Sequence, residues 1–498
     1  MVEKYCGRVL LRFKLLRIHL PFETKKTKVS RIALPARGVA LQDYFMKRFV
    51  ASAGLVVLGT SALYSAPMAG LGPDDPKPWS VSATLRSFYD DNINTTATDK
   101  VGAFGVEISP TLGLNFSLQQ TSIRLGYTYS FKDYDHRPGG NTSHYDQSHL
   151  FNFALDHAFS ERYQIGVRDS FVIGQEPDTL RAGNTPLSSF QRIPGDNIRN
   201  YGSITFNAQL TPLFGLEVGY ANSYFDYKDE GAIVNPGPMT IDDGGAPVSV
   251  VNAVSPSLSG VLDRMENVVH LDTRWTVVPT TTFIVGGQAR QVEYTADELI
   301  SGATDAGDGT TVIIPYAKSG SRDFREYSGY VGAEHSFLPN LSASGKVGAS
   351  YVEYYHNSLG NGDGWSPFAR GSLRWTYSQE NTIELGISHD LNATDIVGAS
   401  SRRATLSAES TIVYANLSHH ITPFLIATAT GQFQNSSFNG GDFDGKSDRF
   451  YLAGISLEYK FTPHLSAQAG YNYDRLESEI AGRGFDRNRV YIGVTAGY

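Results

Sequence analysis

The last segment of the chain, residues 490–498, alternates apolar residues with polar or small ones. Its apolar positions are Val490, Ile492, Val494, Ala496 and Tyr498. Successive side chains of a β-strand point to opposite faces, so this strand has one face for an apolar phase and one for water. The same pattern recurs back to residue 78, and no other feature constrains the fold as strongly. Such repetition is typical of the strands of a membrane-spanning β-barrel.

The composition agrees with a barrel. The 498 residues include 50 Gly, 28 Tyr and 27 Phe, whereas only 18% of them are charged. Mean hydropathy is negative, and there is no run of about 18 apolar residues, which excludes an α-helical membrane protein. Cys6 is the only cysteine. The chain therefore forms no intramolecular disulfide or cysteine-based metal cluster, and it lacks a cysteine for lipid anchoring.

Residues 46–66 have the three parts of a secretory signal peptide: a basic start, an apolar core and small residues near the exit. We expect cleavage between residues 62 and 70. Residues 1–45 are basic and show no strand alternation, so we interpret them as a misassigned extension upstream of a start at Met46. The alternative is a genuine basic extension that stays in the cytoplasm or is removed with the signal.

After the signal peptide we expect a short periplasmic segment at 67–77 and the barrel at 78–498. Removing residues 1–66 takes away 12 of 42 Lys and Arg and 3 of 50 Asp and Glu, which leaves 30 against 47 and a net charge of −17. Nucleic-acid binding needs clustered Lys and Arg, so we exclude nucleic acid as a partner.

Eighteen alternating segments are expected to form strands. They lie near 78–90, 101–118, 121–133, 147–158, 163–174, 197–210, 215–227, 264–277, 282–294, 324–337, 341–354, 365–377, 382–392, 407–420, 424–435, 449–461, 465–475 and 487–498. The connections alternate between short turns, such as Thr211-Pro212, and long loops, such as 228–263. This rhythm predicts an all-β, antiparallel up-and-down transmembrane barrel with short periplasmic turns, long extracellular loops and both ends in the periplasm. Soluble β-sandwiches and solenoids also alternate, but they do not explain this rhythm or the signal peptide.

The first strand ends in Phe88-Tyr89-Asp90-Asp91-Asn92-Ile93, and amphipathic hairpins then continue to the terminal aromatic Tyr498. Over 78–498 the chain resembles the putative β-barrel porin type 2 family of Gram-negative outer-membrane proteins, often found beside exopolysaccharide or cell-surface assembly genes. The resemblance implies a porin-like barrel in the bacterial outer membrane and supplies no catalytic residues. The C-terminal strand ending at Tyr498 also resembles the signal read by the barrel assembly machinery. The implied partners are this machinery, outer-membrane lipid, lipopolysaccharide and polysaccharide.

Charged residues share the strand face opposite the apolar side chains, and we expect them to line the lumen. The candidates are Arg86, Glu107, Arg124, Arg168, Arg199, Glu217, Asp272, Arg274, Glu334, Lys346, Arg370, Arg374, Glu384, Glu458 and Arg489. So many charges would be costly in a dry core, which implies a hydrated or ion-paired interior. Two interpretations stay open. In an aqueous pore, the charges would create a transverse electric field or a series of binding positions for a passing solute. Alternatively, they would form structural ion pairs between neighbouring strands. Aromatic residues on the same face either offer a stacking path for sugar rings or fill space.

Loop 228–263 is too apolar to be fully solvated, and we expect it to fold inward as a constriction. Three functional classes remain: a channel for small hydrophilic solutes or linked to surface polysaccharide export, a non-conducting structural or surface-binding barrel, and an outer-membrane enzyme. His144, Ser148 and His149 are the best candidates for an enzyme, but no acid can be assigned to orient the base. We therefore expect no catalytic residues, no cofactor and no bound metal.

Overall fold

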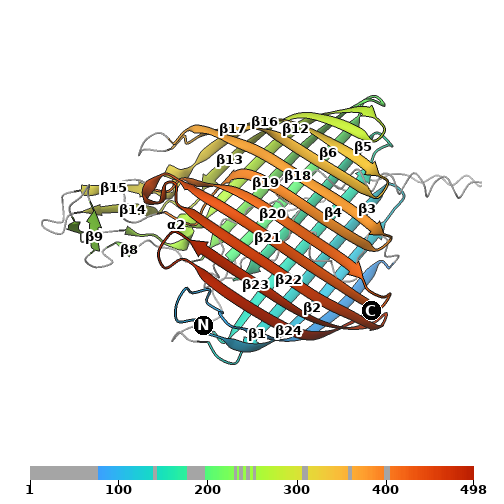
Figure 1. The fold of residues 1–498 in the computed structure, drawn as a ribbon, viewed down its shortest axis with the longest axis horizontal. Coiled ribbons are helices and arrows are strands. Elements are labelled where there is room, and N and C mark those ends of the chain that lie inside the picture. The colour runs from blue at the N-terminus through green and yellow to red at the C-terminus, as the bar shows by residue number, and fades with distance from the viewer. Residues whose placement is uncertain are drawn as a thin grey trace, which may run out of the picture. The chain divides into compact units, whose positions relative to one another are not determined.

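A computed structural model describes residues 77–137, 143–175, 197–228, 233–234, 239–242, 247–250, 254–304, 312–356, 362–397 and 404–498. Eighteen antiparallel strands form one sheet that closes on itself (Figure 1). The first strand pairs with the second and also with the last, where Ser82 faces Gly497 and Asp90 faces Arg489. The predicted 18-stranded barrel is confirmed.

The barrel strands run in sequence order around the wall. They are β1 (Trp79–Asp90), β2 (Ala103–Ser117), β3 (Thr121–Tyr134), β4 (Tyr145–Ala158), β5 (Tyr163–Gly174), β6 (Asn197–Gln209), β7 (Phe214–Tyr227), β12 (Arg264–Val278), β13 (Thr281–Tyr294), β16 (Phe324–Leu338), β17 (Leu341–Glu353), β18 (Gly364–Ser378), β19 (Asn381–Asn392), β20 (Ser407–His420), β21 (Leu425–Asn439), β22 (Ser447–Thr462), β23 (Leu465–Ser478) and β24 (Phe485–Gly497). Each predicted strand has a counterpart. The largest difference is at β21, which continues to Asn439 instead of ending near residue 435.

Smaller elements lie in the long loops. They are β8 (Ile233–Val234), β9 (Met239–Asp242), β10 (Pro247–Val250), β11 (Val254–Ser255), α2 (Leu258–Leu262), β14 (Leu299–Thr304), β15 (Val312–Lys318) and the 3-10 helices η2 (Ser319–Arg322) and η3 (Gly441–Phe443). No helix in the described ranges is long and apolar enough to cross a membrane. The expected upstream extension and signal peptide lie outside the described residues, so both stay predictions.

Threonine side chains fix several of the short turns. The Thr211 hydroxyl accepts hydrogen bonds from the backbone N–H groups of Leu213 and Phe214, at 3.3 and 3.0 Å. Thr422 makes the same contact with the backbone N–H of Leu425 at 3.0 Å. The following proline fixes its own φ angle, so a Thr-Pro pair reverses the chain within a few residues. These turns gather at one end of the barrel, here called the short-turn end, and the other end is the long-loop end.

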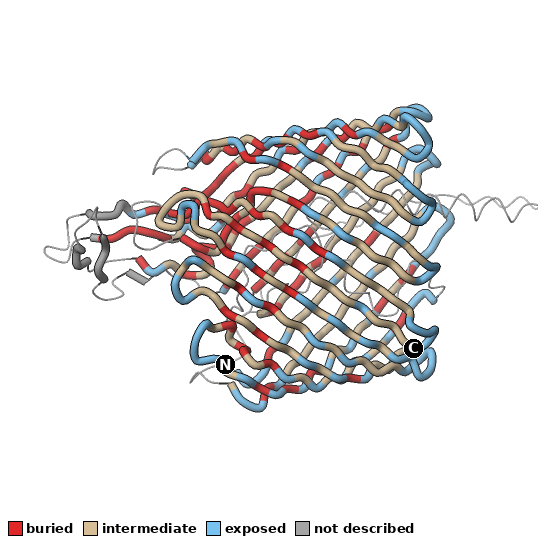
Figure 2. Tube along the Cα trace, in the orientation of Figure 1, coloured by how far each residue is buried: buried red, intermediate tan, exposed pale blue. Residues whose placement is uncertain are grey.

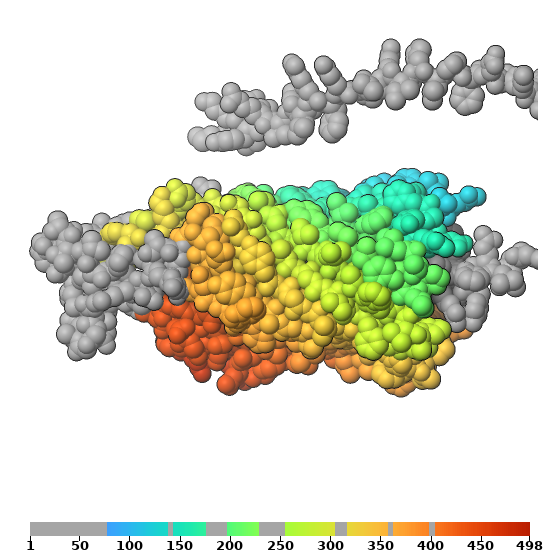
Figure 3. Space-filling view, turned by 90° about the horizontal axis from the view of Figure 1, so that it is seen from above, coloured from blue at the N-terminus to red at the C-terminus, as the bar shows by residue number. Residues whose placement is uncertain are grey.

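The two faces of the wall differ as the alternation predicts. On β12, Val269 and Leu271 are 50% and 49% exposed, whereas His270 and Asp272 between them are 3% and 0% exposed. Apolar side chains therefore cover the outside of the barrel, and Figure 3 looks onto part of this outer surface. A closed sheet satisfies its backbone hydrogen bonds internally, so this apolar outside suits lipid.

The two ends of the described chain meet at the short-turn end. The N–H of Tyr498 donates to the carbonyl of Val81 at 2.8 Å, and the rings of Trp79 and Tyr498 lie 5.3 Å apart. Figure 2 shows that buried residues gather toward the opposite, long-loop end. The packed part of the molecule is therefore the long-loop mouth of the barrel.

Candidate functional site

A first group of interior charges joins strands β1 to β5. Arg86 Nη1 lies 3.1 Å from Glu107 Oε2, and Arg124 Nη2 lies 3.3 Å from Asp156 Oδ2. Arg168 pairs with the same Asp156 carboxylate from the next strand. The side chains of Arg86, Arg168 and Asp156 remain 28%, 28% and 46% exposed. These pairs therefore contact solvent on the interior face.

A second group joins β7, β12, β16 and β17 through shared carboxylates. Glu217 lies 3.2 Å from His270 Nε2 and 3.6 Å from Arg274 Nη1. Arg274 Nη2 also donates to Glu334 at 2.5 Å, and Lys346 Nζ lies 2.5 Å from Asp272. Each carboxylate of this group lies beside Arg274 or Lys346 and is therefore paired with a basic side chain.

Glycine makes room for this second group. A Cβ atom added at Gly219 would lie 1.9 Å from His270 Cε1. One added at Gly286 would lie 2.0 Å from the Asp272 carboxylate. Side chains at these positions would displace the His270 ring and the Asp272 carboxylate, so the positions of both residues depend on a glycine in a neighbouring strand.

Most of the predicted interior candidates lie in ion pairs with neighbours. The paired ones are Arg86, Glu107, Arg124, Arg168, Glu217, Asp272, Arg274, Glu334, Lys346, Arg370 and Arg489. Glu384 instead accepts from the Tyr414 hydroxyl at 3.1 Å. Arg199 is buried on β6, and Arg374 and Glu458 form no ion pair with any described residue. The contacts favour structural pairing of neighbouring strands, while lumen lining stays a prediction.

Interior aromatic residues also pack against neighbours. The rings of Tyr330 and Phe368 stack with centroids 5.2 Å apart, and Ile284 shares their buried cluster. Tyr201 meets Phe225 edge to face at 5.7 Å. Buried rings in mutual contact fill space, so these contacts favour the space-filling interpretation over a sugar path.

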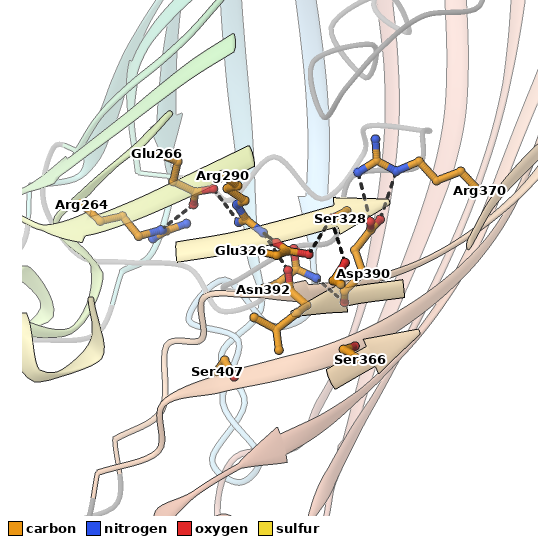
Figure 4. A network of polar contacts seen from close by, with 12 residues as sticks. Arg264, Glu266, Arg290, Glu326, Ser328, Ser366, Arg370, Asp390, Asn392 and Ser407 are labelled. Atoms are coloured by element: carbon orange, nitrogen blue, oxygen red, sulfur yellow. Dashed lines mark hydrogen bonds and ion pairs between the residues drawn. The ribbon is translucent and has the colours of Figure 1, made fainter. Parts of the chain in front are cut away.

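A third charged network lies near the long-loop end (Figure 4). Arg264 Nε donates to Glu266 at 2.8 Å, and Arg290 Nη2 donates to the other Glu266 oxygen at 2.6 Å. Arg290 Nη1 also lies 3.5 Å from Glu326, which accepts from the Ser328 hydroxyl at 3.4 Å. The Glu266 carboxylate thus links two arginines from adjacent strands, and Arg290 links two carboxylates.

Three arginines hold the end of β19 and the segment that follows it. We call residues 391–397 and 404–406 the mouth segment. Arg290 Nη1 donates to the Leu391 carbonyl at 2.7 Å, and Arg322 Nη2 donates to the Thr394 carbonyl at 2.5 Å. Arg483, in the loop between β23 and β24, donates to Asp395 at 2.7 Å. The donors come from β13, η2 and a distant loop, so the mouth segment is fixed from several parts of the mouth.

The buried clusters show how far the mouth segment reaches. Val397 and Ala404 belong to one cluster with Tyr201 and Phe225 of β6 and β7. Ile396 belongs to another, with Phe438 of β21. Strand order puts β21 nearly opposite β6 and β7 in the closed wall. The mouth segment therefore crosses the long-loop end of the barrel.

The expected constriction by loop 228–263 is only partly covered by the structure. Residues 254–263 are described, and Val261 and Leu262 are buried in the same cluster as Val397. Much of residues 229–253 lies outside the described residues. The mouth segment was not predicted, because its sequence has neither the length nor the apolar content that singled out loop 228–263.

The arginines of the mouth differ in their charge environment. Arg322 is fully buried against the Tyr294 ring and forms no ion pair with a described carboxylate. Burial, together with the nearby Arg264 charge, holds the pKa of Arg322 below its usual range. Burial also opposes the charge of Arg483, but Asp395 and Asp448 outweigh it and raise the pKa of Arg483. The Arg483 contacts are thus charge-assisted, whereas Arg322 acts through backbone carbonyls.

The structure separates two of the three candidate enzyme residues. Ser148 and His149 are adjacent on β4, so their side chains point to opposite faces of the wall. His149 lies on the outer face, where its Nδ1 is 3.0 Å from the Tyr127 hydroxyl. A nucleophile and its base must share one face, so this arrangement does not form a catalytic pair. Within the described ranges, no group of three or more His, Cys, Asp or Glu is placed to hold a metal ion.

Several network residues were missed from the sequence. Arg264 and Glu326 share the parity of the interior candidates on their strands, and Arg290 shares the parity of the buried Ile284 and Val292 on β13, but all three lie near strand ends. Extending the alternation of inward and outward positions to the ends of the strands would have identified these residues. Arg322 and Arg483 lie in loops, where no periodic signal exists, and only their tertiary contacts identify them.

The family model of putative beta-barrel porin 2 matches residues 316–498. Similar solved structures include OccAB4 of Acinetobacter baumannii, at 11% identity and TM-score 0.37, covering 86% of this chain and 100% of that one. OpdK of Pseudomonas aeruginosa with vanillate has 11% identity and TM-score 0.38, with 84% and 99% coverage. A BenF-like porin from Pseudomonas fluorescens Pf-5 has 11% identity and TM-score 0.38, with 85% and 99% coverage.

Structural similarities at this level of identity and TM-score carry no conclusion about the solute or the function. No curated protein matches the chain. The apolar outer face, the closed 18-stranded wall and the family match are those of a barrel in the bacterial outer membrane. The chain is therefore a bacterial outer-membrane β-barrel whose residues 316–498 match the family model of putative beta-barrel porin 2.

Proposed function

We propose that the protein is a channel for small hydrophilic solutes with a narrowed long-loop mouth. The observation that carries the proposal is the partial exposure of charged interior side chains, such as Asp156 at 46% and Arg168 at 28%. A dry, filled barrel would bury such charges at a high desolvation cost. Barrels of 16 to 18 strands are wide enough for water, and the interior candidates would then line an aqueous lumen.

The mouth segment favours small solutes over an exported polymer. Val397 and Ala404 are 4% and 1% exposed, so the segment packs tightly where it crosses the barrel end. A polysaccharide chain would need this packing to open along its full width. A link to surface polysaccharide rests only on the family resemblance and is not part of the proposal.

The same packing supports a second candidate, a non-conducting structural or surface-binding barrel. In that case the mouth segment is a permanent closure, and the long loops would carry the function. An enzyme is the least favoured reading because the best candidate pair, Ser148 and His149, is split between the two faces of β4.

Liposome swelling separates the two candidates. The full-length protein is reconstituted and exposed to sugars of increasing size, with a sample boiled before reconstitution as the control. We expect swelling that slows from mono- to trisaccharides and stops for a polysaccharide, since the narrowed mouth selects by size. If the protein is folded, as its heat-modifiable gel migration would report, but swelling equals that of the control, the channel proposal is wrong and the second candidate replaces it.

A further inference from the structure

Asp169 is an unusual residue because it lies on the outer face of the barrel wall. Its neighbours on β5 face inward: Arg168 pairs with Asp156, and Ser170 is fully buried. Asp169 is the seventh of the twelve residues of β5. Every other outward-facing Asp, Glu, Lys or Arg of the described barrel strands lies within four residues of an end of its strand. Asp169 is the exception.

Asp169 lies near the middle of the membrane. It lies six positions along β5 from Tyr163, which is at the short-turn end of the strand. With a rise of about 3.3 Å per residue and a strand tilt of about 40°, this places it about 15 Å along the membrane normal. The apolar band of such barrels is about 25 Å tall, so Asp169 belongs to the part that faces hydrocarbon.

Asp169 also belongs to a row of polar positions on the outer face. Strand pairing aligns Asp169 with Gly202, Gly202 with Asn222, and Asn222 with Asn267. Asn200 Nδ2 donates to both oxygens of Asp169, at 3.1 and 3.3 Å. The row therefore crosses β5, β6, β7 and β12 without interruption by a large apolar side chain.

The polar groups of this row are linked to one another on β7 and β12. Asn222 Nδ2 donates to Asn267 Oδ1 at 2.9 Å, and the Tyr220 hydroxyl donates to the same oxygen at 2.8 Å. Asp169 has only the Asn200 amide as a donor and forms no ion pair with a described cation. An ionised carboxylate accepts about four hydrogen bonds, and lipid tails offer none. This face therefore fits a protein surface better than lipid.

We propose that the outer face of β5, β6, β7 and β12 is the contact surface between two copies of this chain in the outer membrane. Copies that share a membrane are related by a rotation about the membrane normal, which keeps each residue at its depth. This face holds an acceptor in Asp169 and amide donors in Asn200 and Asn222, which lie two to three positions further from the short-turn end of their strands. A second copy of the same patch thus brings donors to the acceptors of the first.

The surroundings of the row suit such a contact. Ile204, Val218 and Tyr220 are 45%, 43% and 43% exposed and supply apolar contact area around the polar groups. Gly202 leaves the carboxylate open, since a Cβ there would lie 3.2 Å from Asp169 Oδ1. Polar side chains between apolar transmembrane surfaces promote association, because their alternative is hydrocarbon. Figure 3 looks onto the outer face of the wall, where these strands are coloured from teal to yellow-green.

Disulfide crosslinking in isolated outer membranes tests the proposal. In full-length protein with Cys6→Ala, Ile204→Cys is compared with Val413→Cys on β20, eight strands further along the closed wall and 47% exposed. We expect Ile204→Cys to give a band at twice the monomer mass that contains only this chain, and Val413→Cys to give none. Equal crosslinking at both sites, no crosslinking at Ile204→Cys, or a product that contains another protein would each overturn the proposal.

A second variant tests the part played by the carboxylate. Asp169→Leu should weaken self-association by about tenfold, which corresponds to about 1.4 kcal/mol and to the usual size of a polar contact between membrane segments. The monomer should stay heat-modifiable, because leucine suits the outer face. Asp133→Leu, at the end of β3, is the matched control and should leave self-association unchanged. An unchanged dimer fraction in folded Asp169→Leu would overturn the proposal.

Discussion

Replacing Asp395 by alanine should release the mouth segment. Asp395 accepts a hydrogen bond from Arg483 at 2.7 Å, and the two side chains are only 9% and 11% exposed. A hydrogen bond to a charged group contributes about 1.5 to 3 kcal/mol. Arg483 keeps its second partner, Asp448, at 2.8 Å, so the loss of stability is confined to the mouth segment. A loss of about 2 kcal/mol corresponds to about a 30-fold larger open population.

Two assays read this change. Hydrogen exchange of the amides of residues 391–397 should accelerate about 30-fold, since exchange reports the population that opens locally. Single-channel recordings should show open events more frequent by the same factor. The control is Asp297→Ala, whose partner Lys318 lies 2.8 Å away with both side chains exposed, at 57% and 81%. Such a surface pair contributes less than about 1 kcal/mol, so the control should match the wild type.

Two results would refute this reasoning. Faster exchange without a change in conductance would mean that the mouth segment does not restrict the passage. Unchanged exchange in Asp395→Ala would mean that the contact between Arg483 and Asp395 does not hold the segment in place.

Val494→Arg on the outer face should hinder assembly, at a cost of about 1 to 3 kcal/mol, whereas Thr495→Arg on the inner face should have a smaller effect. If the two variants give equal yields of heat-modifiable protein, the inner and outer faces are assigned wrongly. Arg374→Glu should shift the reversal potential toward cation selectivity, because this exposed side chain forms no ion pair with a described residue; an unchanged potential would place Arg374 outside the ion path. N-terminal sequencing of the outer-membrane form should find a start after Ala62 and no later than Leu71. Recovery of residues 1–45 on that form would contradict both the start site and the signal peptide.

The sequence predicted the wall of the barrel well, because each strand has to match only lipid on one face and the interior on the other. This condition is local, so alternation located β5, β6 and β20 within one residue at each end. Turn chemistry is equally local: Thr211 and Thr422 mark turns that their own hydroxyls stabilise.

The contacts of the mouth could not be predicted in this way. Arg322 and Thr394 are 72 residues apart, and Arg483 and Asp395 are 88 residues apart, and no periodic pattern connects loops at such separations. Asp169 is an intermediate case. Its acidic side chain at an apolar position was visible in the sequence, but the polar row became clear only from the register of β5 with β6 and β7.

Single-channel recording of the intact protein in a planar bilayer tests the proposed channel most directly. We predict discrete steps of small conductance with weak ion selectivity, because most interior charges are in ion pairs and neither sign dominates. The Asp395→Ala variant should give the same or larger steps with more frequent opening. If folded, reconstituted protein and this variant both conduct no better than bare lipid, the barrel is not a channel.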